Sequence, residues 1–504
     1  MPKHSVILSL LLIFFITPVY AIEFWVSKNG NDNNSCTSEQ TDACLSIQKA
    51  ISLARAGDTI NITPGTYIEN SASSPFVSKC VWMDSTYASL CLETSGTPNN
   101  PIIIQAAPGR SGEVILDSQL ERIGIHTMTS DYIHIKGLTI KNNYVIGIAS
   151  WGQVQNTVAN IDTLSIGIVI ENNKIINTGG PYGMNMSGIG MWGSKDWVVK
   201  NNLIDTAYTI DSTRGAAGIQ AYGTINALIE HNEIKNVSNG IFWKDHFIKD
   251  LATRSPWFES EIRYNKIKAD VYGVLIGIRG AKSPEAGENY IHHNIIYGFG
   301  NSGAGIRSNM AGAFAVSAPI RIEHNLIDGG DSLSDAISLD ANSQVTFLGN
   351  ILIRSKTDIA LIRYSDTKVV KLTSSDYNIF DASFHLAADR YSKGNSKDYS
   401  TLSDWQAATS SDALTVAVNQ PDQNSIIATH SGLFAQLDDT DYRYKTNSLA
   451  NNFMPNNDNA GPYQLSNEVI GRIVAAPIET NTINLLQKAA VLQIILNKRR
   501  VEKK

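Results

Sequence analysis

The pattern aliphatic-x-x-Asn-x-aliphatic recurs along the middle of the chain, with polar stretches between its copies. Its asparagines are Asn173, Asn202, Asn232, Asn265, Asn294, Asn325 and Asn350, and Asn378 belongs to a degenerate last copy. Successive copies lie 25 to 33 residues apart. A repeat of this length is typical of a solenoid, in which each repeat forms one coil and packs only on its neighbours. The pattern therefore predicts an all-β protein, a right-handed parallel β-helix.

We expect each asparagine to lie at the bend between two strands of a coil. Asparagine tolerates left-handed backbone angles, and its side-chain amide can bond to the same amide one coil above. In an earlier coil, residues 133–140, Gly137 stands at the bend.

The residue two places before each asparagine forms a predicted outward column. Its members are Glu171, Lys200, Glu230, Arg263, His292, Glu323 and Leu348. With coils about 4.8 Å apart, the first four alternate in charge, which favours the in-register stack. We interpret these charges as structural, and we expect His231, His293 and His324, one place before the asparagine, to stack on one another.

A second strand follows each asparagine motif and usually begins with a glycine. If the aliphatic residue after the glycine points inward, alternation sends every second residue outward. The outward set is then Gly190, Trp192, Gln220, Tyr222, Phe242, Lys244, Leu275, Arg279, Arg307, Asn309, Ser338 and Asp340.

The N-terminal part predicts a cap for the solenoid. Residues 24–27 favour a strand, and we expect Asp42 to cap a helix that ends at Gly57. The apolar face of this helix would consist of Ile47, Ala50, Ile51 and Ala54.

The elements Val-Ser-x-Asn-Gly-x-Asp, Ile-Gln-x-Ala-Ile, Ala-Gly-Asp-Thr-Ile and Pro-Gly-Thr-Tyr follow one another between Trp25 and Tyr67. This run resembles the N-terminal cap of secreted right-handed β-helix proteins of the pectate lyase-like superfamily, such as polysaccharide lyases of families six and nine. Residues 439–444 and 459–464 resemble the segment that often closes such domains. The resemblance implies the fold and an extended polysaccharide as ligand. It leaves the reaction open, because related solenoids include lyases, epimerases, hydrolases and non-catalytic surface proteins.

Five regions are expected along the chain. They are a signal peptide at 1–21, the cap and first coils at 22–100, the parallel β-helix at 101–400, a closing segment at 401–480 and a basic helical tail at 481–504.

The first residues have the pattern of a secretory signal peptide. Lys3 and His4 precede an apolar run at 6–16, which is too short to span a bilayer, and a cleavage-like site ends at Ala21. We therefore expect a secreted or periplasmic protein with no membrane span, and a monomer. The formal charge of -6 becomes -7 without Lys3, and gives no support for a nucleic-acid partner.

All four cysteines follow the expected cleavage point and lie early in the chain. They are Cys36, Cys44, Cys80 and Cys91. In an oxidising compartment they could form local disulfides 36 to 44 and 80 to 91, although three pairings are possible and free thiols are an alternative. No Cys/His cluster has the spacing of a zinc site.

Cleavage of a uronic acid polymer by β-elimination requires a cation on the C6 carboxylate, a base for the C5 proton and a donor for the leaving oxygen. Lys244, Arg279 and Arg307 fall on three successive coils of one predicted face. The resemblance to family six lyases implies a lysine base with an arginine on a nearby coil. We assign Lys244 as base, with His246 as the alternative base, Arg279 as carboxylate clamp or acid, and Arg307 as a subsite contact.

Aromatic rings on the same face predict stacking against sugar rings. Trp192, Tyr222 and Phe242, together with Asn309, are the expected substrate contacts. The function we favour is therefore a lyase of an anionic, uronic acid-containing polysaccharide. The alternative is a non-catalytic carbohydrate-binding or surface adhesion solenoid, because outward cations and aromatics occur on any solenoid. Hydrolysis or epimerisation through an acid such as Asp245 ranks below both.

A calcium ion is possible but has no firm ligand set. Gln220 and Tyr222 stand where the resemblance to family six would require carboxylates and an asparagine. The dense acidic cluster, of the kind that family nine lyases use, is Asp328, Asp331, Asp335 and Asp340. These residues suit calcium by ligand type, but solvation of a loop is the favoured explanation, so no metal ligand is assigned.

Overall fold

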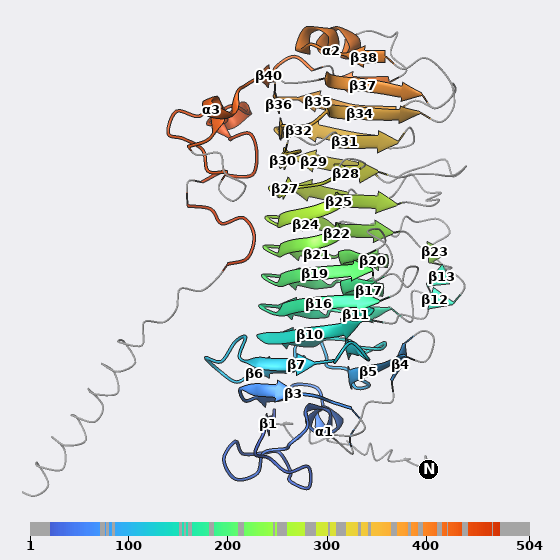
Figure 1. Cartoon of the computed structure of the whole chain (residues 1–504), viewed down its shortest axis with the longest axis vertical. Helices are drawn as coiled ribbons and strands as arrows, with labels where there is room; N and C mark the ends of the chain where they lie inside the picture. The colour runs from blue at the N-terminus through green and yellow to red at the C-terminus, as the bar shows by residue number, and fades with distance from the viewer. Residues whose placement is uncertain are drawn as a thin grey trace, which may run out of the picture.

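The computed structural model is an all-β stack of coils with one helix at each end (Figure 1). It describes residues 21–473 apart from 71–75, 77–79, 83–85, 151–153, 156–157, 160–163, 181–185, 210–215, 245–246, 249–259, 278–288, 301–302, 309–318, 331–333, 341–343, 364–369, 382–384, 392–396, 411–415, 421, 436–441 and 466. The expected signal peptide and basic tail lie outside these residues.

The strand before each asparagine belongs to a parallel sheet of 13 strands. Its members are β1 (Glu23–Val26), β2 (Thr59–Ile62), β6 (Ile102–Ala106), β9 (Ile133–Lys136), β15 (Val169–Glu171), β18 (Val198–Lys200), β21 (Leu228–Glu230), β24 (Glu261–Arg263), β26 (Asn289–His292), β29 (Ile320–Glu323), β32 (Gln344–Leu348), β35 (Val370–Asp376) and β39 (Val416–Gln420).

The strand after each asparagine stacks in the same way on a second face. These strands are β3 (Gly65–Tyr67), β7 (Val114–Asp117), β10 (Leu138–Tyr144), β16 (Lys174–Gly180), β19 (Leu203–Thr209), β22 (Glu233–Lys244), β25 (Lys266–Gly277), β27 (Ile295–Tyr297), β30 (Leu326–Asp328), β33 (Ile351–Ile353), β36 (Ile379–Phe380) and β40 (Ile426–Ile427).

The strands that begin near a glycine form the third face. Strands β22 and β25 run around the corner from the second face and continue on the third. The other strands here are β5 (Thr86–Cys91), β8 (Ile123–His126), β11 (Ile146–Ala149), β17 (Ser187–Lys195), β20 (Ala217–Ile225), β28 (Ala304–Ser308), β31 (Asp335–Asp340), β34 (Thr357–Arg363) and β37 (His385–Tyr391). Short strands extend it, namely β4 (Val81–Trp82), β14 (Ser165–Ile166) and β38 (Lys397–Tyr399), while β12 (Val154–Gln155), β13 (Val158–Ala159) and β23 (Phe247–Ile248) form a separate sheet.

The recurring glycine of the third face is required by close packing at the corner. A Cβ atom at Gly218 would lie 2.4 Å from the Cγ2 atom of Ile234, and one at Gly240 would lie 2.3 Å from that of Ile267. The aliphatic residue that follows each glycine, such as Ile219, points inward and is completely buried. Burial does not alternate along this strand, because the neighbouring Gln220 is also buried.

The asparagines form one continuous buried ladder, as predicted. Each of Asn202, Asn232 and Asn265 donates from its Nδ2 to the Oδ1 of the next asparagine at 3.0 Å. The backbone N–H of Asn232 donates to the same Oδ1 of Asn265, also at 3.0 Å. The ladder runs from Asn173 to Asn378, and all its members are buried.

The expectation that these asparagines adopt left-handed angles is wrong. The left-handed residue is the preceding one, for example His231 with φ 53° and Tyr264 with φ 52°. Asparagine is required here because its side-chain amide forms hydrogen bonds to two coils, and not because it tolerates left-handed backbone angles. Gly137, with φ 75°, occupies the left-handed position of its own coil.

Outside the ladder, the charged column and the stacked rings follow the sequence prediction. Glu171 pairs with Lys200 at 3.3 Å, and Glu230 pairs with Arg263 at 2.7 Å. The ring of His293 stacks on that of His324 with centroids 4.9 Å apart. These contacts explain the charges and histidines as part of the stack.

The N-terminal cap is confirmed, but its capping residue is not the expected one. Helix α1 (Ile47–Leu53) is capped by Ser46, which accepts from the N–H of Lys49, and Asp42 binds Ser35 and Thr37 instead. The buried carboxyl of Glu69 accepts from the N–H of Ile47 at 2.9 Å. Burial raises the pKa of Glu69 to about 7. The helix ends at Leu53, before the expected Gly57.

The cysteines pair as Cys36–Cys44 and Cys80–Cys91. This is the local pairing that the sequence left as one of three. Disulfides of this kind fit an oxidising compartment. Among the described helices, none is both long and apolar enough to cross a bilayer.

The expected closing segment begins with a helix at the end of the stack and continues as a segment that returns along the coils. Helix α2 (Leu402–Thr409) covers the last coil with its buried Trp405. Beyond α3 (His430–Leu433), the chain turns back and runs beside the asparagine corner as the C-terminal strap, residues 442–473 apart from 466 (Figure 1). A single 3₁₀ turn, Pro455–Asn457, lies within it.

Backbone hydrogen bonds hold the strap to successive coils. The N–H of Gly461 donates to the carbonyl of Gly349, and the N–H of Gly471 donates to that of Tyr264. At the end of the strap, the backbone of Ile473 both accepts a hydrogen bond from the side-chain amide of Asn201 and donates one to it. The strap therefore covers the side of the solenoid rather than its end.

Candidate functional site

The outer strand face consists of the outward residues of β17, β20, β22, β25 and β28. Strand pairing places Gly190, Gln220, Phe242, Leu275 and Arg307 in one column. Two residues further along, Trp192, Tyr222, Lys244 and Gly277 form a second column. The backbones of Lys244 and Arg307 therefore belong to the same sheet, and the shared orientation of their side chains stays a prediction.

The two largest predicted stacking surfaces are not open. Trp192 is 4% exposed and Tyr222 is 2% exposed, and their rings lie 4.7 Å apart. The indole Nε1 of Trp192 lies 3.3 Å from the place of a Cβ at Gly190, so the indole folds back over the gap that this glycine leaves. Phe242 is partly exposed. Alternation gave the direction of these side chains but not their packing.

Arg307 is held in place by an aromatic neighbour. Its Nη1 donates to the hydroxyl of Tyr272 at 2.7 Å, and its guanidinium carbon lies 5.3 Å from the centre of the Tyr272 ring. The backbone of Lys244 pairs with Tyr222 on one side and Gly277 on the other. Arg279, His246 and Asn309 lie outside the described residues, as does the side chain of Lys244.

Several buried polar atoms of the outer strand face lack a hydrogen-bond partner among the residues that the structure describes. They are the Oγ of Ser187, the Oε1 of Gln220 and the Nε of Arg307. The Nε2 of Gln220 donates to the hydroxyl of Tyr222 at 3.1 Å. Buried polar groups are normally paired. Three polar atoms on one face that are unpaired within the described residues therefore indicate that this face can form hydrogen bonds to a further molecule.

Of the acidic cluster considered for calcium, Asp331 and the side chain of Asp340 lie outside the described residues. Asp328 is fully buried, forms an ion pair with Arg354 and accepts from the hydroxyl of Tyr442 at 2.8 Å. It therefore anchors the start of the strap. The only grouping of three potential ligands among the described residues includes Cys80 and Cys91, which form a disulfide.

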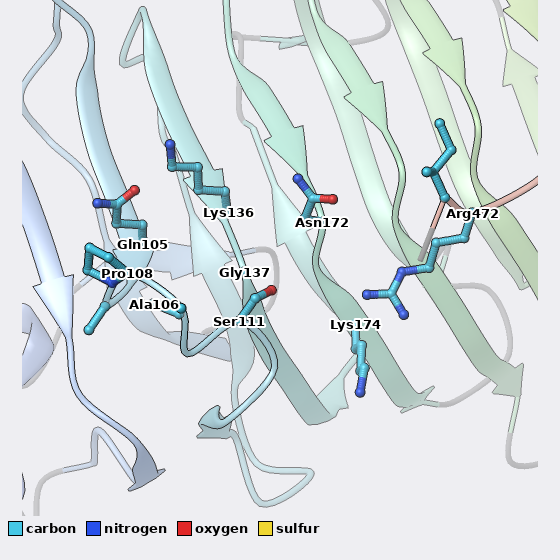
Figure 2. Close-up of a pocket in the computed structure, with 12 residues that line it drawn as sticks. Gln105, Ala106, Pro108, Ser111, Lys136, Gly137, Asn172, Lys174 and Arg472 are labelled. Carbon is cyan, nitrogen blue, oxygen red and sulfur yellow. The ribbon is translucent and has the colours of Figure 1, made fainter. Parts of the chain in front are cut away.

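The structure also shows a hollow that the sequence interpretation missed, at the asparagine corner near the N-terminal end (Figure 2). This corner groove has a volume of about 560 Å³ and is lined by Gln105, Ala106, Ala107, Pro108, Gly109, Ser111, Lys136, Gly137, Asn172, Lys174, Arg472 and Ile473. Arg472 is separated from the other cations by about 300 residues of sequence, so no local pattern could have placed them together.

The stacked parallel strands define the fold as a right-handed parallel β-helix. A family model described as the Pel9A-like right-handed β-helix region matches residues 24–318, more than half of the chain. The protein belongs to this family. A search of curated proteins found no match.

Solved structures similar to this chain include a pectate lyase, Pel9A, with 14% identity over 91% of this chain and 98% of that one, at a TM-score of 0.48. A rhamnogalacturonan lyase has 12% identity over 92% and 98% of the two chains, at 0.42. An alginate lyase from Paenibacillus sp. str. FPU-7 has 13% identity over 63% and 91%, at 0.35. These are likenesses of fold, and none of them assigns a residue role here.

Proposed function

We propose that this protein cleaves an anionic, uronic acid-containing polysaccharide by β-elimination on the outer strand face. The observation that supports the proposal is the strand register, which puts the backbones of Lys244 and Arg307 in one sheet, with Arg307 bonded to Tyr272. Lys244 lies two coils away from Arg307 and two residues further along its strand than the column of Arg307. Membership of the Pel9A-like family supports a polysaccharide as the ligand.

Each step of the reaction has a candidate group on this chain. Lys244 is the proposed base for the C5 proton, with His246 as the alternative. Arg279 would neutralise the C6 carboxylate, which makes the C5 hydrogen more acidic, or protonate the leaving oxygen. Arg307 would bind a neighbouring uronate. Charge-assisted hydrogen bonds from guanidinium to carboxylate are stronger than neutral ones.

The structure reduces the number of aromatic rings that are proposed to contact the substrate. Trp192 and Tyr222 are buried, so of the three rings Phe242 is the one proposed to contact the polymer. The donors that face this region, Gln220 and the buried Tyr222, do not fit a calcium ion, which requires several carboxylate or carbonyl oxygens. The proposed reaction therefore relies on cationic side chains.

The test is incubation with alginate, pectate and chondroitin while the ultraviolet absorbance of unsaturated uronate is followed. We expect activity on at least one polymer, and a decrease in kcat of about 10²- to 10⁴-fold in Lys244→Ala, the usual contribution of a general base. Lys235→Ala is the matched control, because Lys235 lies on the same strand but pairs with Glu233 at 3.0 Å. An unchanged kcat in Lys244→Ala would remove its assignment.

The second candidate is a solenoid that binds glycan without turnover. It is favoured by the absence of carboxylates at Gln220 and Tyr222, the two positions noted above. Under this alternative, no unsaturated product forms, and binding persists in Lys244→Ala but fails in Phe242→Ala. A product with a new reducing end and no unsaturation would instead indicate hydrolysis.

A further inference from the structure

The corner groove exists because one coil lacks a side chain that its neighbours carry. At the left-handed position of the corner, successive coils present Asn172, Asn201, His231 and Tyr264, whereas the coil before them has Gly137. Gly137 therefore adds no side chain to this column, and the Oγ of Ser111 and the Cβ of Ala106 lie 3.2 and 3.3 Å from the place where its Cβ would be.

Two segments form the walls of the corner groove. On one side, the loop between β6 and β7 turns outward at Gly109 and Ser111, and the N–H of Gly112 donates to the carbonyl of Gly137. On the other side, the strap ends with Ile473 bound to Asn201. The groove is thus the stretch of corner that lies between the protruding loop and the end of the strap.

Three cations from three separate segments line the groove, and none of the described lining residues is acidic. Lys136 and Lys174 belong to consecutive coils and are half-buried, and Arg472 belongs to the strap. Figure 2 shows the guanidinium of Arg472 extending from the strap toward Asn172 and Lys174. No ion pair is formed by any of the three within the described residues.

The guanidinium of Arg472 has a hydrogen-bond donor that is not satisfied within the described part of the chain. Its Nε is buried and has no hydrogen-bond partner among the described residues. Burial lowers the pKa of its guanidinium, although Glu233 opposes this effect. Glu233 itself pairs with Lys235 at 3.0 Å, while Glu171 pairs with Lys200 and Glu113 pairs with Arg110. The groove therefore concentrates three positive charges, none of which forms an ion pair among the described residues.

We propose that the corner groove is a second binding site, which takes a short segment of an anionic saccharide through Lys136, Lys174 and Arg472. Its volume of about 560 Å³ lies within the range of about 300–1,000 Å³ that is usual for ligand sites. An arginine fork and two lysines suit carboxylates along a chain. The choice of a saccharide rests on the proposed function, whereas the anion site rests on the groove alone.

This site lies on the corner that follows the first sheet, not on the outer strand face. A polymer held there would remain attached while another part of it is on the outer strand face. Two linked contacts raise the effective concentration of the polymer at the second contact. The groove would therefore strengthen binding of long chains more than of short ones.

The test is isothermal titration calorimetry with trigalacturonate and with trimannuronate, performed on the Lys244→Ala protein so that the probe is not consumed. Binding is expected for at least one trimer, and it weakens with salt. Addition of Lys174→Gln or Arg472→Gln should weaken the groove contribution about tenfold, the loss expected for one charge-assisted contact. Addition of Lys195→Gln, an equal charge change outside the groove, should have no effect.

Because Arg472→Gln could also loosen the strap, Lys174→Gln is the deciding variant, and its unfolding temperature should match that of the parent. The proposal is overturned if neither trimer binds, if Lys174→Gln binds as the parent does, or if fully methyl-esterified trigalacturonate binds equally well. Sodium sulfate that binds as tightly as the trimers would show a site for small anions instead.

These outcomes are separable from those of the proposed function. If the wild-type protein cleaves no uronate polymer but Lys174→Gln loses trimer binding, the lyase proposal fails and the groove remains. If turnover depends on Lys244 while Lys174→Gln has no effect on binding, the groove proposal fails alone. In an active protein, Lys174→Gln should raise KM for long polymers and leave kcat for short oligomers unchanged.

Discussion

The asparagine corner and the outer strand face are built from the same coils, yet they use their polar groups in opposite ways. At the corner, every ladder asparagine is buried and bonded to the coils on both sides. On the outer strand face, Ser187, Gln220 and Arg307 keep buried atoms without a partner among the described residues. The first arrangement increases stability, whereas the second lowers it and is retained for another reason.

The largest expected effect tests the corner. Asn265→Ala would remove bonds to Asn294 and leave two donors of Asn232 unsatisfied. Because each such buried donor costs about 1–3 kcal/mol, we expect a loss of about 3–5 kcal/mol in the free energy of unfolding. Urea denaturation followed by circular dichroism measures it.

The matched control is Asn289→Ala. Asn289 is also an asparagine and also buried, at 5% exposed, but neither atom of its amide group has a partner among the described residues. Its replacement should cost little or increase stability. Equal losses for Asn265→Ala and Asn289→Ala would contradict the importance of the ladder bonds.

The stacked histidines outside the ladder give the corner a pH dependence. Burial lowers the pKa of His293 to about 2 and, with help from Arg263, that of His292 to about 3. The unfolded chain therefore binds protons that the folded chain does not, and stability falls as the pH decreases below about 6.5. At pH 5, each histidine costs up to about 2 kcal/mol.

The comparison of His293→Asn with the wild-type protein isolates this effect. Asparagine occupies the same left-handed position at Asn172 and Asn201, so the backbone is preserved. The unfolding temperature of the variant should decrease less between pH 7 and pH 5. The comparison cancels the opposite contribution of Glu69, whose raised pKa makes the fold more stable as the pH falls through about 7. Parallel pH profiles would show that His293 does not titrate on unfolding.

The sequence was sufficient for the corner because the corner is periodic. Asn265 and its counterparts recur with their coil, and so do His293 and the charges at Glu230 and Arg263, so one correct repeat predicts all the others. The repeat assigned the left-handed angle to the wrong residue, because the asparagine and the residue before it recur with the same spacing.

The sequence was less informative about the outer strand face and the corner groove. Alternation predicts that Lys244 and Arg307 share one face, but it carries no information on how Trp192 packs over Gly190. The groove depends on Arg472, which reaches it only because the strap folds back along the coils. Contacts between distant segments have no local signal, and for this reason the groove was found only in the structure.

The smallest expected effect tests the outer strand face itself. Gln220 is 1% exposed, and its Oε1 lacks a partner among the described residues. Replacement by leucine in Gln220→Leu removes this unsatisfied atom, together with one bond to Tyr222. We expect stability to be unchanged or to increase by up to about 1 kcal/mol, while kcat/KM on the uronate polymer decreases. If the face keeps its unpaired groups for a ligand, the two quantities move in opposite directions, and an increase in stability with undiminished kcat/KM would mean that Gln220 does not serve the ligand.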